Sequence, residues 1–168
     1  EIAQCLVGSE MCIRDSSKTL VPQIQYLNNS KAVAFRDDGF VIFEGKQIPE
    51  ESKVVTVEDE ILSTFCDGEN IGLVFRNTQG ESPYRMELYS STGRLKWETG
   101  VDIAFEHIMV SKDQILLYNS SEFAVYSMNG TCRYQGTLKE GSVQNIFKVA
   151  QNRYMVIMEG GMETIKLG

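Results

Sequence analysis

His107 is the only histidine in the sequence, and so the only side chain with the usual acid–base chemistry for catalysis near neutral pH. A Ser/His/Asp or Cys/His arrangement would need it as the general base. It stands in FEHIMV, where alternation places Phe105, His107 and Met109 on one face of a strand. No GxSxG turn accompanies it, and zinc would need a second histidine or paired cysteines. We therefore expect no catalytic residue and no metal ligand here.

Acidic residues gather in short clusters, among them Asp37-Asp38 and Glu58-Asp59-Glu60. None has the spaced oxygen ligands of a calcium loop, and nothing singles out a pair of carboxylates for glycoside hydrolysis. Acids between strands are typical of solvated turns. The sequence also has no P-loop and no GxGxxG motif. We therefore expect no cofactor.

The first sixteen residues differ in character from the rest. Cys5 and Cys12 are separated by six residues, which fits neither a CxxC redox motif nor common zinc spacing. The string LVGSEMCIRDS resembles the translation of a transposase-type sequencing adapter. We therefore predict that residues 1–16 are a non-native, disordered segment. The two remaining cysteines, Cys66 and Cys132, are predicted to be small buried hydrophobes in separate strands.

Composition is that of a soluble globular domain, with 168 residues of which 42% are hydrophobic. The formal net charge is −7, and an acidic surface repels phosphate backbones. The aromatic residues lack the interleaved Lys and Arg of a base-stacking platform. Nucleic acid is therefore excluded as the expected partner. No apolar run approaches the length of a membrane span, which is about 18 residues.

Short apolar or alternating runs follow one another from Val21 onward, separated by turn residues. Hairpin turns are predicted at Asp38-Gly39, Asn129-Gly130 and Gly160-Gly161, because these dipeptides supply the positive φ that tight turns require. No segment shows helical periodicity over a helical length. The chain is therefore predicted to be all-β.

The hairpins repeat at a spacing of about 40 residues. Phe35, Phe75, Tyr118 and Met158 take equivalent places, at spacings of 40, 43 and 40. In the following strands the equivalent residues are Phe43, Tyr89, Tyr126 and Leu167. Four short strands per repeat are typical of a propeller blade. We predict a partial β-propeller of about three and a half four-stranded antiparallel blades, with a β-sandwich as the alternative.

One segment, LYSSTGRLKWETG, resembles the tryptophan-docking motif of quinoprotein-like propellers. Gly93 and Trp97 match that motif, whereas Ser90 stands where the family usually has Asp. A weaker copy, VYSMNGTCRYQG, has Gly130 and carries Tyr134 at the tryptophan position. The resemblance implies a structural role for these residues in docking neighbouring blades. It does not imply a quinone.

The whole of residues 21–167 resembles a family of propeller-like proteins of clostridial-type Gram-positive bacteria, classed as a domain of unknown function. The likeness lies in SKAVAFRDDGFVIFEGKQIPEE, in NIGLVFRNTQGESPYRMELYSSTGRLKWETG and in the ending METIKLG. It implies a membrane-anchored protein with an extracytoplasmic propeller. Residues 17–168 would then be the C-terminal portion of that propeller, and its N-terminal blades would lie upstream. The family has no assigned catalytic residues.

Together these observations predict a non-enzymatic propeller module that binds a protein or a cell-envelope ligand through a rigid frame. The alternative is a fragment of a quinoprotein-like enzyme, whose cofactor site would come largely from other blades.

Overall fold

The computed structural model describes residues 23–138 and 143–167, and the predicted adapter segment lies outside them. All the regular elements described are strands. Their bounds are β1 Gln23–Asn28, β2 Lys31–Arg36, β3 Gly39–Glu44, β4 Glu50–Thr56, β5 Ile61–Cys66, β6 Asn70–Arg76, β7 Tyr84–Ser90, β8 Leu95–Val101, β9 His107–Ser111, β10 Gln114–Tyr118, β11 Glu122–Ser127, β12 Cys132–Thr137, β13 Val143–Ala150, β14 Arg153–Met158 and β15 Gly161–Lys166.

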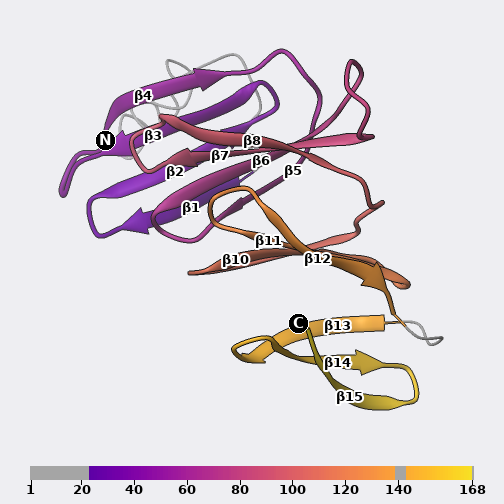
Figure 1. Cartoon of the computed structure of the whole chain (residues 1–168). Coiled ribbons are helices and arrows are strands. Elements are labelled where there is room, and N and C mark those ends of the chain that lie inside the picture. The colour runs from indigo at the N-terminus through magenta and orange to yellow at the C-terminus, as the bar shows by residue number, and fades with distance from the viewer. Residues whose placement is uncertain (1–22, 139–142, 168) are drawn as a thin grey trace.

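These strands form four sheets, each made from consecutive strands that pair antiparallel (Figure 1). We name them blade 1 (β1–β4), blade 2 (β5–β8), blade 3 (β9–β12) and blade 4 (β13–β15). The first three have four strands and blade 4 has three. Two of the predicted hairpin glycines begin a strand with positive φ, since Gly39 has 138° and Gly161 has 151°.

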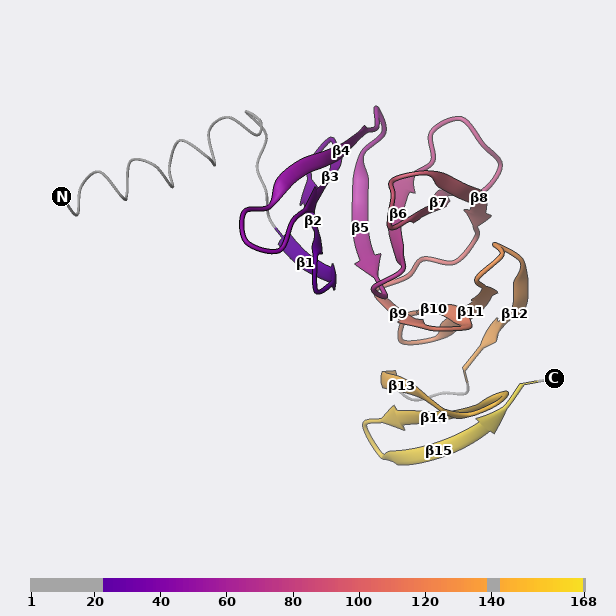
Figure 2. The ribbon, with the colours of Figure 1, turned by 90° about the vertical axis from the view of Figure 1, so that its left-hand side faces the viewer.

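The four sheets follow one another around an arc (Figure 2). The first strand of each sheet lies on the concave side, and β4, β8 and β12 lie on the convex side. One hydrophobic cluster lies at each junction. Blades 1 and 2 share a cluster that contains Phe40 and Leu73, blades 2 and 3 share one with Leu88 and Ile115, and blades 3 and 4 share one with Tyr118 and Val156.

Blades 2 and 3 are therefore buried on both faces. In β6, Leu73 belongs to the cluster with blade 1, and its neighbour Val74 belongs to the cluster with blade 3. A β-sandwich would instead leave one face of each sheet in water. The predicted all-β propeller arc is confirmed, and the sandwich alternative is wrong.

The same irregularity occurs in the outer pairing of each complete blade. Its fourth strand has one extra residue relative to the third strand, which makes a β-bulge. The extra residues are Ser52, Lys96 and Arg133, and the residues that follow them are Lys53, Trp97 and Tyr134. Strand pairing thus places Lys53, Trp97 and Tyr134 at equivalent positions of blades 1, 2 and 3.

Candidate functional site

His107 lies at the start of β9 with its side chain exposed. Its ring stacks against that of Tyr118 on the neighbouring strand, with centroids 5.0 Å apart and planes tilted by 32°. Within residues 23–138 and 143–167, no three His, Cys, Asp or Glu side chains gather closely enough to hold a metal ion.

The acidic clusters make ion pairs at the ends of strands. Asp38 accepts two hydrogen bonds from Arg36, at 2.7 and 2.5 Å. Asp59 accepts one from Arg85 at 2.8 Å, and Glu60 lies 3.2 Å from Arg76 Nε. These pairs hold turns against strands.

The cysteines lie in separate strands, as predicted, but the expectation that both are buried is wrong for Cys132, which is exposed. Cys66 is half-buried, and its thiol donates to Gln25 Oε1 on blade 1. Burial raises the pKa of the Cys66 thiol. That thiol therefore stays protonated at neutral pH and is a poor nucleophile.

Trp97 reaches from β8 of blade 2 to blade 3. Its indole Nε1 donates to the Met128 carbonyl oxygen at 2.8 Å. The ring lies against Gly130, which has φ of 86°; a Cβ on that glycine would be 2.9 Å from Trp97 Cδ2. The turn residue thus has to be glycine for two reasons, backbone conformation and the space occupied by the indole.

Gly93 holds the equivalent turn of blade 2, with φ of 74°. A Cβ there would lie 2.7 Å from Lys53 Cγ of blade 1, so an aliphatic stem takes the place that the indole takes one blade later. Tyr134, at the same position in blade 3, packs partly against the cluster shared with blade 4. The equivalent turn of blade 4 would follow β15, beyond Lys166.

A buried polar chain crosses blade 2 on its face toward blade 1. Glu87 is only 6% exposed and accepts a hydrogen bond from the Tyr89 hydroxyl, while Arg85 Nη2 lies 3.1 Å from its other oxygen. The Arg85 guanidinium also lies over the Phe75 ring, 4.9 Å from its centroid. Burial, and then the bond to Glu87, raises the pKa of Tyr89. Sequence reasoning missed this chain, because alternating polar residues in YRMELYS resemble a solvent face.

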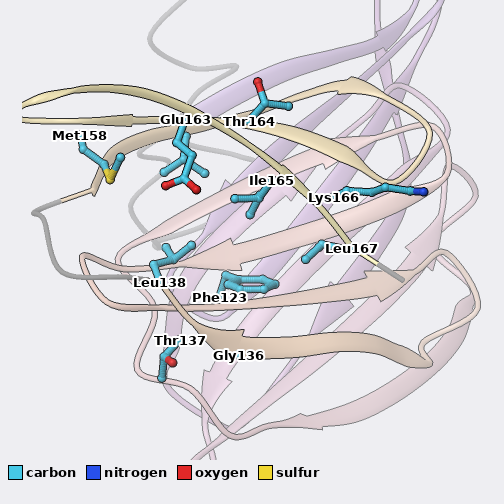
Figure 3. Close-up of a pocket in the computed structure, with 11 residues that line it drawn as sticks. Phe123, Gly136, Thr137, Leu138, Met158, Glu163, Thr164, Ile165, Lys166 and Leu167 are labelled. Carbon is cyan, nitrogen blue, oxygen red and sulfur yellow. The ribbon is translucent and has the colours of Figure 1, made fainter.

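A pocket of about 440 Å³ lies between blades 3 and 4, on their outer side. Phe123 and Leu138 form its blade 3 wall, and Ile165 faces them from β15 (Figure 3). We call it the inter-blade pocket. Its lining residues are Phe123, Gly136, Thr137, Leu138, Val156, Met158 and residues 163–167.

The inter-blade pocket lies beside the outer edge of blade 4, which has three strands among the described residues. The outer strand of blade 3, β12, has no fourth strand of blade 4 beside it among the residues described. The outer edge of β15 is likewise unpaired in the part of the chain that the structure covers. An edge strand presents free backbone N–H and C=O groups, so the pocket combines an apolar wall with a row of hydrogen-bonding groups.

Two charged side chains, Glu163 and Lys166, are among the residues that line the pocket. The partner of Glu163 across the sheet is Val156, as Tyr154 is the partner of Ile165, so Glu163 and Ile165 share the face of β15 toward blade 3. Figure 3 shows both side chains directed toward Leu138 and Phe123, whereas Thr164 points to the other side of β15. The arrangement can hold an extended segment with apolar side chains.

Fold and site together define a propeller-type repeat protein with an open pocket between blades 3 and 4. The model of a family of unknown function, DUF5711, matches residues 6–167, and the chain belongs to this family. No curated protein matches the sequence.

Solved structures share the fold at low identity. Sqt1 of Saccharomyces cerevisiae superposes with a TM-score of 0.61 and 10% identity over 91% of this chain and 47% of its own. BBS1N, solved in complex with ARL6DN, superposes with a TM-score of 0.56 and 12% sequence identity, over 86% of this chain and 49% of its own. The computationally designed Ika4 protein superposes with a TM-score of 0.57 and 10% sequence identity, over 90% of this chain and 94% of its own. The chain thus spans about half the length of the first and second of these.

Among the residues described, no helix is long and apolar enough to cross a membrane.

Proposed function

We propose that this chain is a non-enzymatic binding scaffold of the propeller type, and that the inter-blade pocket holds a polypeptide partner. The observation that carries the proposal is a pocket with an apolar wall that lies beside a strand edge left unpaired among the described residues. Added strands are a common mode of peptide recognition, because edge hydrogen bonds supply affinity and side-chain pockets supply specificity. The blades on either side are held by continuous hydrophobic clusters, so the site is presented by a rigid frame.

A selection from a library of linear peptides tests this function. The immobilised chain is expected to enrich peptides that bind Ile165→Asp at least about ten-fold more weakly, because a carboxylate in the apolar wall costs more than 1.4 kcal/mol. Met162→Asp is the matched control, since Met162 lies on the other face of the same strand, is 71% exposed and does not line the pocket. Failure to enrich any peptide, or equal loss with both variants, would contradict a binding role for the pocket.

The two ends of the arc carry a second part of the proposal, which is that further blades of the same polypeptide continue it. Ile24 and Tyr26 of blade 1 point away from blade 2 and are 63% and 83% exposed. Phe147 and Met162 of blade 4 point away from blade 3 and are 41% and 71% exposed. Exposed apolar sheet faces of this kind are interaction surfaces.

Display outside a membrane, by an anchor upstream, completes the proposal and rests on the family resemblance. Protease treatment of intact cells that express the complete gene is the test. Cleavage of the propeller without lysis is expected, and protection until lysis would contradict it.

The blade-docking role of Gly93, Trp97, Gly130 and Tyr134 belongs to the same proposal. It is supported by the contacts of Trp97 with Met128 and Gly130. A quinoprotein-like enzyme fragment stays the alternative, and titration with pyrroloquinoline quinone tests it. An absorbance change with redox activity would favour the enzyme.

A further inference from the structure

We infer that a second pocket, between blades 1 and 2, binds a basic segment of a polypeptide partner. A Lys or Arg side chain of the segment enters the pocket, and further basic side chains lie against the acidic loops around it. We call this site the Asp37 pocket. It has a volume of about 440 Å³ and is lined by Gln23, Phe35, Arg36, Asp37 and residues 61–64. The site is distinct from the inter-blade pocket and therefore goes beyond the proposed function.

Three elements meet at the Asp37 pocket: the start of β1, the turn between β2 and β3, and the start of β5. Strand β5 has a β-bulge there, in which Leu62 is the extra residue. Leu62, Phe35 and Ile61 contribute apolar surface, and Ser63 and Thr64 contribute hydroxyl groups. The pocket thus suits the long aliphatic stem of a Lys or Arg side chain.

Two charged side chains, Arg36 and Asp37, line the pocket. Arg36 is 8% exposed and donates to both carboxylate oxygens of Asp38, at 2.7 and 2.5 Å. This bidentate pairing compensates the charge of the guanidinium. Asp37 is exposed and forms no ion pair with any residue in the described ranges. The three side chains together leave one negative charge, which a cationic head group can compensate.

The loops around the Asp37 pocket are acidic. Because consecutive strands pair antiparallel, the β2–β3, β6–β7, β10–β11 and β14–β15 turns lie at the same end of the sheets as the connections between blades, on the right-hand side of Figure 1. We call it the acidic end. Its described loop residues include no Lys or Arg and nine acids: Asp37, Asp38, Glu58, Asp59, Glu60, Glu81, Asp102, Glu106 and Glu159.

The opposite end of the sheets has no such excess. Its described loops (29–30, 45–49, 67–69, 91–94, 112–113, 128–131 and 151–152) carry three acids and three bases. Three arginines at strand ends, Arg36, Arg76 and Arg85, pair with loop acids of the acidic end. With these arginines counted, acids still outnumber bases there by nine to three. Electrostatic attraction therefore directs a basic partner to this end.

The spread of these acids favours a polypeptide over a metal ion or a small amine. Within residues 23–138 and 143–167, no three His, Cys, Asp or Glu side chains gather closely enough to hold a metal ion. The acids lie in loops from the β2–β3 turn of blade 1 to the β14–β15 turn of blade 4, so only a long ligand can meet several of them. A segment with several Lys or Arg residues has that length, and the Asp37 pocket anchors it.

Fluorescence anisotropy with a labelled peptide of four Leu-Lys repeats tests the site. Saturable binding that weakens as the salt concentration rises is expected. The test variant neutralises three exposed acids of the acidic end: Asp37→Asn, Glu58→Gln and Glu81→Gln. The control variant neutralises three exposed acids at the opposite end: Glu50→Gln, Glu51→Gln and Glu69→Gln. The test variant should bind about five- to ten-fold more weakly, and the control variant should change binding less than about two-fold.

Hydrogen exchange locates the anchor. Amide hydrogens of residues 61–64 are expected to exchange more slowly in the complex, and those of residues 67–69, at the opposite end, should be unchanged. Ile165→Asp, in the inter-blade pocket, should leave the affinity for the Leu-Lys peptide unchanged.

Four results would overturn this assignment and leave the proposed function standing. Absence of saturable binding, or equal weakening by the two triple variants, would show that the acidic end is no binding surface. Exchange of residues 61–64 that is unaffected by the peptide would show that the Asp37 pocket is not the anchor. Competition by calcium or n-butylamine at concentrations near those of the peptide would identify a metal or small-amine site. Loss of binding in Ile165→Asp would place the peptide in the inter-blade pocket.

Discussion

Trp97 joins blades 2 and 3 through a hydrogen bond to Met128 and a ring contact with Gly130. Trp97→Ala is expected to lower the free energy of unfolding by about 2–3 kcal/mol, since the side chain is half-buried and its ring contacts and its bond to Met128 are both lost. Trp97→Phe should cost only about 1 kcal/mol, because chiefly the hydrogen bond is lost. Urea denaturation followed by circular dichroism measures both values. Leu95→Ala, on the same strand and 45% exposed, is the control and should stay within about 0.5 kcal/mol.

A substitution at Gly130 tests the same contact with Trp97 from the blade 3 side. Gly130→Ala places a methyl group on a backbone with φ of 86° and 2.9 Å from the indole, so we expect a loss of about 1–2 kcal/mol. In a Trp97→Ala background the steric part of that loss should disappear, leaving only the backbone part. Equal losses in both backgrounds would show that the indole does not press on the turn.

The raised pKa of Tyr89 predicts how the free energy of unfolding depends on pH in the alkaline range. Its pKa is raised in the folded protein, so the neutral hydroxyl is favoured by folding. The corresponding stability is complete below the unfolded pKa, which is about 10, and is lost as pH rises above it. Urea denaturation between pH 8 and 11 should therefore show that the free energy of unfolding falls more steeply with pH for the native sequence than for Tyr89→Phe. Tyr26→Phe, at a residue 83% exposed, should leave the slope unchanged.

At the scale of elements, the repeated bulge fixes the register between the third and fourth strands. Deletion of Lys96 is expected to destabilise the protein by more than about 2 kcal/mol, because Trp97 or Leu95 must then change faces. Lys96→Ala keeps the bulge and loses only the bond to Asn70, so its cost should stay near 1 kcal/mol. Chemical denaturation compares the two variants. A deletion no worse than the substitution would show that the bulge has no role in register.

Sequence patterns predicted the elements well and the surfaces between them poorly. The fourth strands of the first three blades were found, because their spacing recurs in those three repeats. The equivalence of Leu167 with Tyr89 was wrong, since strand pairing aligns Ile165 with Tyr89. Alternation also misled for Glu87, because a central blade has no solvent face and buries its polar side as well. The inter-blade pocket depends on how β12 passes beside β15, which no local pattern contains.

At the scale of the whole molecule, the arc exposes two apolar end faces. We expect the isolated chain to associate as its concentration rises, by contact of these faces. Sedimentation velocity should show a shift toward monomer for the double variant Phe147→Lys and Met162→Lys, and Phe147→Leu with Met162→Leu serves as the control. Unchanged association in the lysine variant would place the contact elsewhere.

The consecutive strand order also affects how the protein acquires its structure. The strands of each sheet come from one contiguous stretch of the sequence, and within residues 23–138 and 143–167 no sheet takes a strand from a distant part of the chain. Backbone pairing therefore closes only short loops, which favours rapid folding for an all-β protein. Each sheet can form as soon as its own residues leave the ribosome and can then serve as a template for the next one.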